Sequence, residues 1–216
     1  MNRERTISGG VYLVLDPARE QRALLTITRQ VLAGGIAVIQ LWNHWLPGQD
    51  KKAFISEVCT MAHEQGVPVL INEEWELVLD TDLDGVHFDE FPQSLSAIRQ
   101  QAGRTLQMGL TCGNDLDRIR RGIDEGFDYL SFCALFPSRS ANSCELVRPE
   151  TIKAARQMSR LPIFVSGGIT PENLQSLAGT GLDGVAVISG ILDAPDPAGM
   201  VQQYKQSISN VNNKQV

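Results

Sequence analysis

The sequence predicts an α/β protein built as a single (β/α)₈ TIM barrel. Eight short apolar runs recur along its 216 residues without the strict alternation of a half-exposed sheet, as expected of strands buried on both faces. Helical patterns lie between the runs, and several of them end in glycine just before the next strand. A segment also repeats, since GLDGVAV (181–187) echoes DLDGVHF (82–88) and GFDYLSF (126–132) is a looser copy. Together these observations indicate one strand-then-helix unit used eight times.

The expected strands are placed by their apolar cores. In chain order they are VYLVL (11–15), IAVIQL (36–41), VPVLIN (67–72), DGVHF (84–88), LQMGLT (106–111), DYLSFC (128–133), LPIFVSGG (161–168) and DGVAVIS (183–189). A doubly wound open sheet is the alternative, but it more often has fewer strands, and no GxGxxG follows the first run. Because composition does not change along the chain, we expect one domain over residues 1–209 and a polar tail over 210–216.

Charge and composition narrow the class of partner. Hydrophobic residues make up 43% and charged residues 20%, and the formal net charge is −6 with no basic run. This balance argues against nucleic acid or an anionic membrane as a partner, but it leaves small anionic ligands open. No signal peptide or membrane-length apolar run is visible, and the four cysteines show no CxxC spacing, so we expect a cytoplasmic protein. A homo-oligomer is compatible with all of this.

The ends of the last two strands predict a phosphate site. In such barrels the working face is the carboxyl end of the strands, and phosphate commonly binds after strands seven and eight. VSGGITPEN (165–173) closes the seventh strand and opens a helix with Thr170 as its N-cap, and VISGIL (187–192) follows the eighth. Backbone N–H groups there can surround a phosphate monoester, and we assign Gly167, Gly168, Ile188 and Ser189 to this role. The alternative is that the glycines only permit a tight turn.

The whole chain resembles the thiamine phosphate synthase family and its relative, the thiazole tautomerase. The likeness runs in order through GVYLVL (10–15), AGGIAVIQL (33–41), VPVLIN, DGVHF, MGLT (108–111), FDYLSFCALFPS (127–138), VSGGITPEN and GVAVISGI (184–191). The resemblance implies a transferase in which a thiazole phosphate nitrogen attacks an aminopyrimidine methyl diphosphate and pyrophosphate leaves. Pyrophosphate leaves well only when cations neutralise its charge, so Mg²⁺ is the implied cofactor and a small phosphorylated heterocycle the implied ligand.

Part of the family's site is kept in this chain. Gln40 stands at the family's glutamine, Asn72 at its asparagine and Thr111 at a serine, so we expect these three to be catalytic. The loop after the sixth strand keeps two hydroxyls and has one nearby arginine. Here we expect substrate contacts from Ser138, Arg139 and Ser140.

The family's cationic and metal-binding positions are changed. Trp42 replaces an arginine, His44 a lysine and Ala141 a further lysine. Glu73 replaces the magnesium aspartate, and the shortened segment FDEFP (88–92) leaves Asp89 or Glu90 as a stand-in. The resemblance therefore implies a weakened diphosphate and Mg²⁺ site, with Glu73 and Asp89 as the candidate metal ligands.

All three tryptophans of the chain, Trp42, Trp45 and Trp75, fall on the expected rim. Tryptophan offers a broad apolar face and one N–H donor, which suits stacking on a planar ring. We therefore expect Trp42, His44 and Trp75 to contact the substrate, with packing of the loops at the barrel mouth as the alternative. A zinc site at His87 with cysteines from neighbouring strand ends is a weaker alternative than small buried thiols.

Three functions remain open from the sequence. The first is a thiamine phosphate synthase with unusual diphosphate contacts, and the second is a barrel enzyme acting on another phosphate monoester that carries a flat ring. The third is a non-catalytic family member that binds a thiamine-related phosphate. The lost cations count against the first, and the retained hydroxyls and glycines count against general decay of the site.

Overall fold

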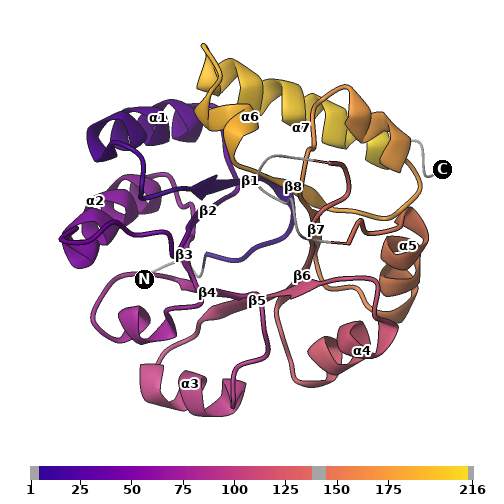
Figure 1. Ribbon diagram of the computed structural model, residues 1–216, viewed down its shortest axis with the longest axis horizontal. Helices are drawn as coiled ribbons and strands as arrows, with labels where there is room; N and C mark the ends of the chain where they lie inside the picture. The colour runs from indigo at the N-terminus through magenta and orange to yellow at the C-terminus, as the bar shows by residue number, and fades with distance from the viewer. Residues whose placement is uncertain (1–4, 138–144, 214–216) are drawn as a thin grey trace.

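The computed structural model describes residues 5–137 and 145–213. Within these ranges eight parallel strands pair in chain order and close on themselves, with β8 against β1. Helices lie around the outside of the closed sheet, and the chain travels once around the barrel from indigo to yellow (Figure 1). The predicted (β/α)₈ barrel is confirmed.

The strands are short and almost wholly buried. They are β1 (Gly10–Leu15), β2 (Val38–Leu41), β3 (Val69–Asn72), β4 (Gly85–Phe88), β5 (Gln107–Cys112), β6 (Tyr129–Phe132), β7 (Ile163–Val165) and β8 (Gly184–Val187). Each overlaps a predicted apolar run. The seventh predicted strand is longer than β7, because the chain leaves the sheet at Ser166. The eighth strand ends before Ser189, which starts a helix.

The outer layer is less regular than eight equal helices. Its α-helices are α1 (Gln21–Ala33), α2 (Lys51–Glu64), α3 (Leu95–Ala102), α4 (Leu116–Asp124), α5 (Pro149–Met158), α6 (Ser189–Leu192) and α7 (Pro197–Asn213). After β3 and β7 the chain makes only single 3₁₀ turns, η1 (Trp75–Leu79) and η2 (Asn173–Leu177). The helix predicted after β7 is therefore reduced to one 3₁₀ turn. Its predicted N-cap is present, because the Thr170 hydroxyl accepts the Asn173 N–H at 3.2 Å and the Asn173 amide oxygen accepts the Thr170 N–H at 2.9 Å. Helix α7 reaches Asn213, so the boundary predicted at residue 210 falls inside it.

The barrel interior is filled by aromatic rings that face glycines on neighbouring strands. Tyr12 and Phe164 meet edge to face with 5.3 Å between ring centroids, and Tyr129 meets Phe164 in the same way at 5.6 Å. A Cβ at Gly109 would lie 2.0 Å from the Tyr129 ring, and one at Gly184 would lie 2.5 Å from the Phe164 ring. These glycines therefore serve close packing, and the rings close the barrel below its mouth.

The repeated segments share one structural role at the amino end of the strands. In each repeat an aspartate just before the strand accepts the backbone N–H at the start of the preceding strand and pairs with an arginine. Asp84 accepts the Val69 N–H at 2.8 Å and pairs with Arg5 at 2.8 Å. The same arrangement joins Asp128 to Met108 and Arg99, and Asp183 to Ile163 and Arg156. We call Asp84, Asp128 and Asp183 the aspartate locks; they hold strands together far from the mouth.

None of the helices in the described ranges combines the length and the apolar character that a membrane span requires.

Candidate functional site

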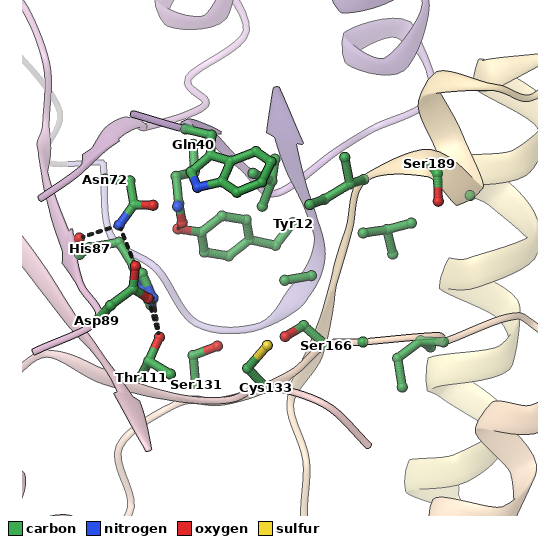
Figure 2. Close-up of a pocket in the computed structure, with 18 of the residues that line it drawn as sticks. Tyr12, Gln40, Asn72, His87, Asp89, Thr111, Ser131, Cys133, Ser166 and Ser189 are labelled. Atoms are coloured by element: carbon green, nitrogen blue, oxygen red, sulfur yellow. Dashed lines mark hydrogen bonds and ion pairs between the residues drawn. The ribbon is translucent and has the colours of Figure 1, made fainter. Parts of the chain in front are cut away.

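A cavity of about 480 Å³ opens at the carboxyl ends of the strands. All eight strands or the loops directly after them contribute to its wall. Figure 2 shows Asn72 and Asp89 on one side of the cavity and Ser189 on the opposite side, with Tyr12 between them. The cavity therefore has two ends, one at the loops after β7 and β8 and one at the ends of β2 to β5.

A hydrogen-bonded series of polar side chains lies at the end of the cavity formed by the ends of β2 to β5. The Tyr12 hydroxyl donates to Gln40 Oε1 at 2.5 Å and lies 2.9 Å from the Tyr129 hydroxyl. His87 follows, with Nδ1 2.8 Å from the Tyr129 hydroxyl and Nε2 2.8 Å from Thr111 Oγ1. This hydrogen-bonded series joins residues of β1, β2, β4, β5 and β6, so it holds the bottom of the cavity rigid.

This hydrogen-bonded series of side chains ends at the carboxylate of Asp89. Thr111 Oγ1 donates to Asp89 Oδ1 at 2.9 Å, and Asn72 Nδ2 donates to Asp89 Oδ2 at 3.0 Å (Figure 2). Because the Thr111 proton goes to Asp89, His87 Nε2 carries a proton and donates to Thr111. The single Tyr129 proton then serves either the Tyr12 hydroxyl or His87 Nδ1, which lie 2.9 and 2.8 Å from the Tyr129 oxygen.

Burial sets the protonation of these groups. It lowers the pKa of His87 to about 4, although the charge of Asp89 opposes the shift, so the imidazole is neutral at pH 7. Burial also raises the pKa of Tyr12 and of Tyr129 well above the ordinary value, so both remain protonated. At neutral pH this end of the cavity therefore places a neutral imidazole and two neutral phenols beside the carboxyl groups of Asp89 and Glu90.

The other end of the cavity is made of backbone. Gly167 and Gly168 have φ of 87° and 64°, a region that side chains rarely adopt, and a Cβ at Gly167 would lie 2.6 Å from Ala134 Cα. The loop after β7 is thus pressed against the loop after β6, where Phe136 N–H donates to the Gly167 carbonyl at 3.0 Å. Within the described residues, the backbone N–H groups of Gly168, Ser189 and Gly190 have no hydrogen-bond acceptor, although all three residues line the cavity. Such unused donors at a cavity wall suit an anion.

The structure brings most of the predicted site residues to one cavity. Those in its wall are Gln40, Trp42, Asn72, Asp89, Thr111, Gly167, Gly168, Ile188 and Ser189. Three predicted residues of the described ranges lie outside the wall, namely His44, Glu73 and Trp75. His44 is exposed, with Nδ1 3.0 Å from Asp16 Oδ1, and Trp75 belongs to η1 and packs against the outer core. Ser138, Arg139 and Ser140 lie outside the described residues, as do Ala141 and Cys144.

Only one of the three tryptophans faces the cavity. Trp45 Nε1 donates to Glu74 Oε2 at 2.9 Å, its ring meets Phe54 edge to face, and the Lys51 ammonium lies 5.5 Å from the ring centroid. Trp45 and Trp75 therefore pack the outer loops, the alternative raised from the sequence, and Trp42 is the one tryptophan that lines the cavity.

The carboxylates do not fit a resident metal ion. Glu73 Oε1 accepts the backbone N–H groups of Asp89 and Glu90 at 2.5 and 3.2 Å, and Glu73 does not line the cavity. Asp89 is engaged by Asn72 and Thr111. Across residues 5–137 and 145–213 no group of three or more His, Cys, Asp or Glu side chains is placed to hold a metal ion, which also leaves the zinc alternative without support.

Several cavity residues were not predicted from the sequence. Tyr12, Ser131 and Ser166 line the wall, and Tyr129 joins the hydrogen-bonded series from below. For His87 the sequence suggests only the zinc alternative, and the structure places it in the cavity wall. Their common signal is an inward position at or near a strand end, which alternation along each strand could have identified.

Comparison with known proteins identifies a family for this chain. A family profile described as thiamine monophosphate synthase matches residues 11–191. The chain belongs to this family. Among curated members of the thiamine monophosphate synthase family, the thiamine-phosphate synthase of Halorhodospira halophila is 30% identical over 203 residues, covering 94% of this chain and 96% of the relative. That of Bordetella pertussis is 32% identical over 193 residues, covering 87% and 89%.

Solved structures show the same fold. A thiamine phosphate pyrophosphorylase from Pyrococcus furiosus superposes with a TM-score of 0.80 at 20% identity, covering 94% of this chain and 96% of that one. The KGPDC of Streptococcus mutans, crystallised with D-R5P, superposes with a TM-score of 0.74 at 15% identity, covering 94% and 99%. At these identities the structural likeness supports the barrel, and the synthase family rests on the sequence matches.

Proposed function

We propose that this chain binds thiazole phosphate or a related ring phosphate across the cavity, as a family member with a weakened diphosphate and Mg²⁺ site. The phosphate lies at the loops after β7 and β8, and the ring extends toward Gln40, Asn72 and Thr111. The observation that carries this proposal is the set of backbone N–H groups at Gly168, Ser189 and Gly190 that have no acceptor among the described residues, opposite the polar end of the same cavity. Three amide donors in one concave wall can satisfy the oxygens of a phosphate monoester.

The diphosphate half of a synthase reaction is poorly supported. The described residues of the cavity wall include no lysine or arginine, and they include the carboxylates of Asp89 and Glu90. A cationic contact to a diphosphate contributes roughly 1.5–3 kcal/mol. The absence of the three cations at Trp42, His44 and Ala141 would therefore slow pyrophosphate departure by several orders of magnitude. We expect the C–N bond-forming transferase reaction of the named relatives to be slow or absent.

A second candidate is binding without turnover. It is favoured by the mutual hydrogen bonds among Asp89, Asn72 and Thr111, which use groups that a synthase directs at its substrates. An enzyme acting on a different ring phosphate would need the same phosphate seat, so the first experiment measures binding and turnover separately.

Isothermal titration calorimetry with thiazole phosphate and with its dephosphorylated alcohol tests the phosphate seat. We expect the phosphate to bind at least tenfold more tightly, since each charge-assisted bond contributes about 1.5–3 kcal/mol. Equal affinities would contradict the proposal.

Turnover is measured by incubating the protein with aminopyrimidine methyl diphosphate, thiazole phosphate and Mg²⁺, beside a curated synthase, and quantifying thiamine phosphate by mass spectrometry. A synthase-like rate would show that the lost cations are not needed. A gain of activity in the triple variant Trp42→Arg, His44→Lys, Ala141→Lys would show that the loss is confined to those contacts.

A further inference from the structure

We infer that the segment before β1, residues 5–9, is a strap across the base of the barrel, and that its docking there fixes the bottom of the cavity at the opposite end. We call this segment the base strap. In Figure 1 it crosses the centre of the barrel before the chain enters β1. Neither Arg5 nor Ile7 lines the cavity, so the strap acts on the cavity through the side chains between them. This coupling concerns the bottom of the cavity and holds whichever ligand binds there.

The base strap is tied at its two ends to opposite sides of the barrel. Two nitrogens of the Arg5 guanidinium each lie 2.8 Å from Asp84 Oδ1, just before β4. At the other end the Gly10 N–H donates to the Asp183 carbonyl at 2.9 Å, just before β8. Gly9 has a φ of 144°, and a Cβ there would lie 2.5 Å from the same carbonyl oxygen, so the backbone passes very close to it. The strap therefore connects two of the three aspartate locks.

Between these ends the strap inserts one apolar side chain into the barrel interior. Ile7 is only 7% exposed and belongs to one hydrophobic cluster with Tyr12, Tyr129 and Phe164, distinct from the larger cluster that packs the helices on the sheet. Its N–H donates to Gln107 Oε1, at the start of β5, at 3.4 Å. Ile7 therefore supports the layer of aromatic rings from the base.

Two of these rings carry the hydroxyls at the bottom of the cavity. The Tyr12 hydroxyl lies 2.5 Å from Gln40 Oε1, and the Tyr129 hydroxyl lies 2.8 Å from His87 Nδ1. Each phenol ring is rigid, so a displacement at its base is carried to its hydroxyl. Because protein interiors are close-packed, a void at Ile7 gives both rings room to move, and their hydrogen bonds weaken with them. The base strap and the hydrogen-bonded series are coupled in this way without touching.

Exchange of the His87 ring proton with water tests the coupling, because the chain has three histidines and each NMR ring signal can be assigned by substitution. Ile7→Ala removes volume from the base. Ile208→Ala makes the same change at an isoleucine of α7 that is also 7% exposed but packs in the larger cluster. We expect the proton on His87 Nε2 to exchange roughly tenfold faster in Ile7→Ala and within about twofold of wild type in Ile208→Ala. Equal changes in the two variants, or no change in Ile7→Ala, would overturn the inference.

A second pair of variants releases the strap without removing volume from the interior, so the test does not depend on the folding of Ile7→Ala. Arg5→Gln breaks the contact between the strap and Asp84, while Arg99→Gln breaks the arginine pair of the Asp128 lock and leaves the strap in place. We expect the His87 ring proton to exchange faster in Arg5→Gln than in Arg99→Gln. The same rate in both would show that docking of the strap does not reach the bottom of the cavity.

The effect on ligand binding rests on the proposed function and is measured with thiazole phosphate. Coupling between two sites is reciprocal, so saturating the wild-type protein with this ligand should slow hydrogen exchange of the Ile7 backbone N–H. In isothermal titration calorimetry Ile7→Ala should bind it roughly threefold or more weakly than Ile208→Ala. Equal affinities in the two variants would contradict the coupling. Failure of the wild-type protein to bind thiazole phosphate would count against the proposed function, and exchange of the His87 ring proton would then decide the coupling alone.

Discussion

Truncation of one aspartate lock should destabilise the barrel strongly without changing its ligand. Asp84 is the most buried of the three, with 12% of its side chain exposed. Its Oδ2 accepts from the Val69 N–H and from His63 Nε2, each at 2.8 Å, and its Oδ1 accepts from Arg5. Asp84→Ala leaves the Val69 N–H without its acceptor, which costs roughly 1–3 kcal/mol, and removes a charge-assisted bond worth a similar amount. We expect a loss of about 3–4 kcal/mol in the free energy of unfolding.

Asp128 is a more exposed lock and should contribute less to the free energy of unfolding than Asp84. Asp128 makes the same backbone bond, to Met108 at 2.7 Å, but 34% of its side chain is exposed, so water can replace the carboxylate. Asp128→Ala should cost about half as much, roughly 1–2 kcal/mol. Urea unfolding followed by tryptophan fluorescence measures both. An Asp84→Ala cost no larger than that of Asp128→Ala would show that burial of the lock does not set its contribution.

Three further predictions concern the barrel interior. The pKa of His87 is lowered from 6.5 to about 4 in the folded protein, so the unfolded chain binds the proton first as pH falls. The free energy of unfolding should therefore drop between about pH 6.5 and 4, by at most about 3 kcal/mol. Thermal unfolding at several pH values should show this drop in the wild type and a smaller one in His87→Gln. Gly109→Ala places a methyl group 2.0 Å from the Tyr129 ring and should cost at least 1–3 kcal/mol, where an unchanged urea midpoint would contradict the packing described. Burial raises the pKa of Cys59 and of Cys112 to about 12, so neither should be alkylated in the native protein at pH 8, as peptide mapping by mass spectrometry would reveal.

The eight strands were predictable because each must be apolar on both faces to lie in a closed sheet, which leaves a strong local signal. The 3₁₀ turns after β3 and β7 were not predictable from hydrophobic periodicity. After β7 the cap bonds of Thr170 and Asn173 are the same whether one turn or several follow, and after β3 the positive φ of Glu73 precedes the turn.

The site was predicted best where a residue ends a strand. Gln40, Asn72 and Thr111 reach the cavity because strand ends in a barrel converge there. Glu73 and Trp75 were placed less well, because Glu73 adopts a positive φ that redirects the chain just after β3. A non-glycine residue in that conformation is uncommon and has no sequence signal. The cytoplasmic location, a homo-oligomer and the contacts of Ser138, Arg139 and Ser140 stay predictions.

The aspartate locks separate the residues that maintain this fold from those that choose its ligand. Each lock joins neighbouring strands at the end of the barrel opposite the cavity, through backbone groups that do not change with sequence. Substitutions at the mouth, such as Trp42→Arg, therefore leave the locks untouched. Substitutions that change the ligand at the mouth can therefore accumulate without removing the bonds that join the strands at the opposite end. Substitutions that change the ligand would then be confined to the carboxyl end of the strands.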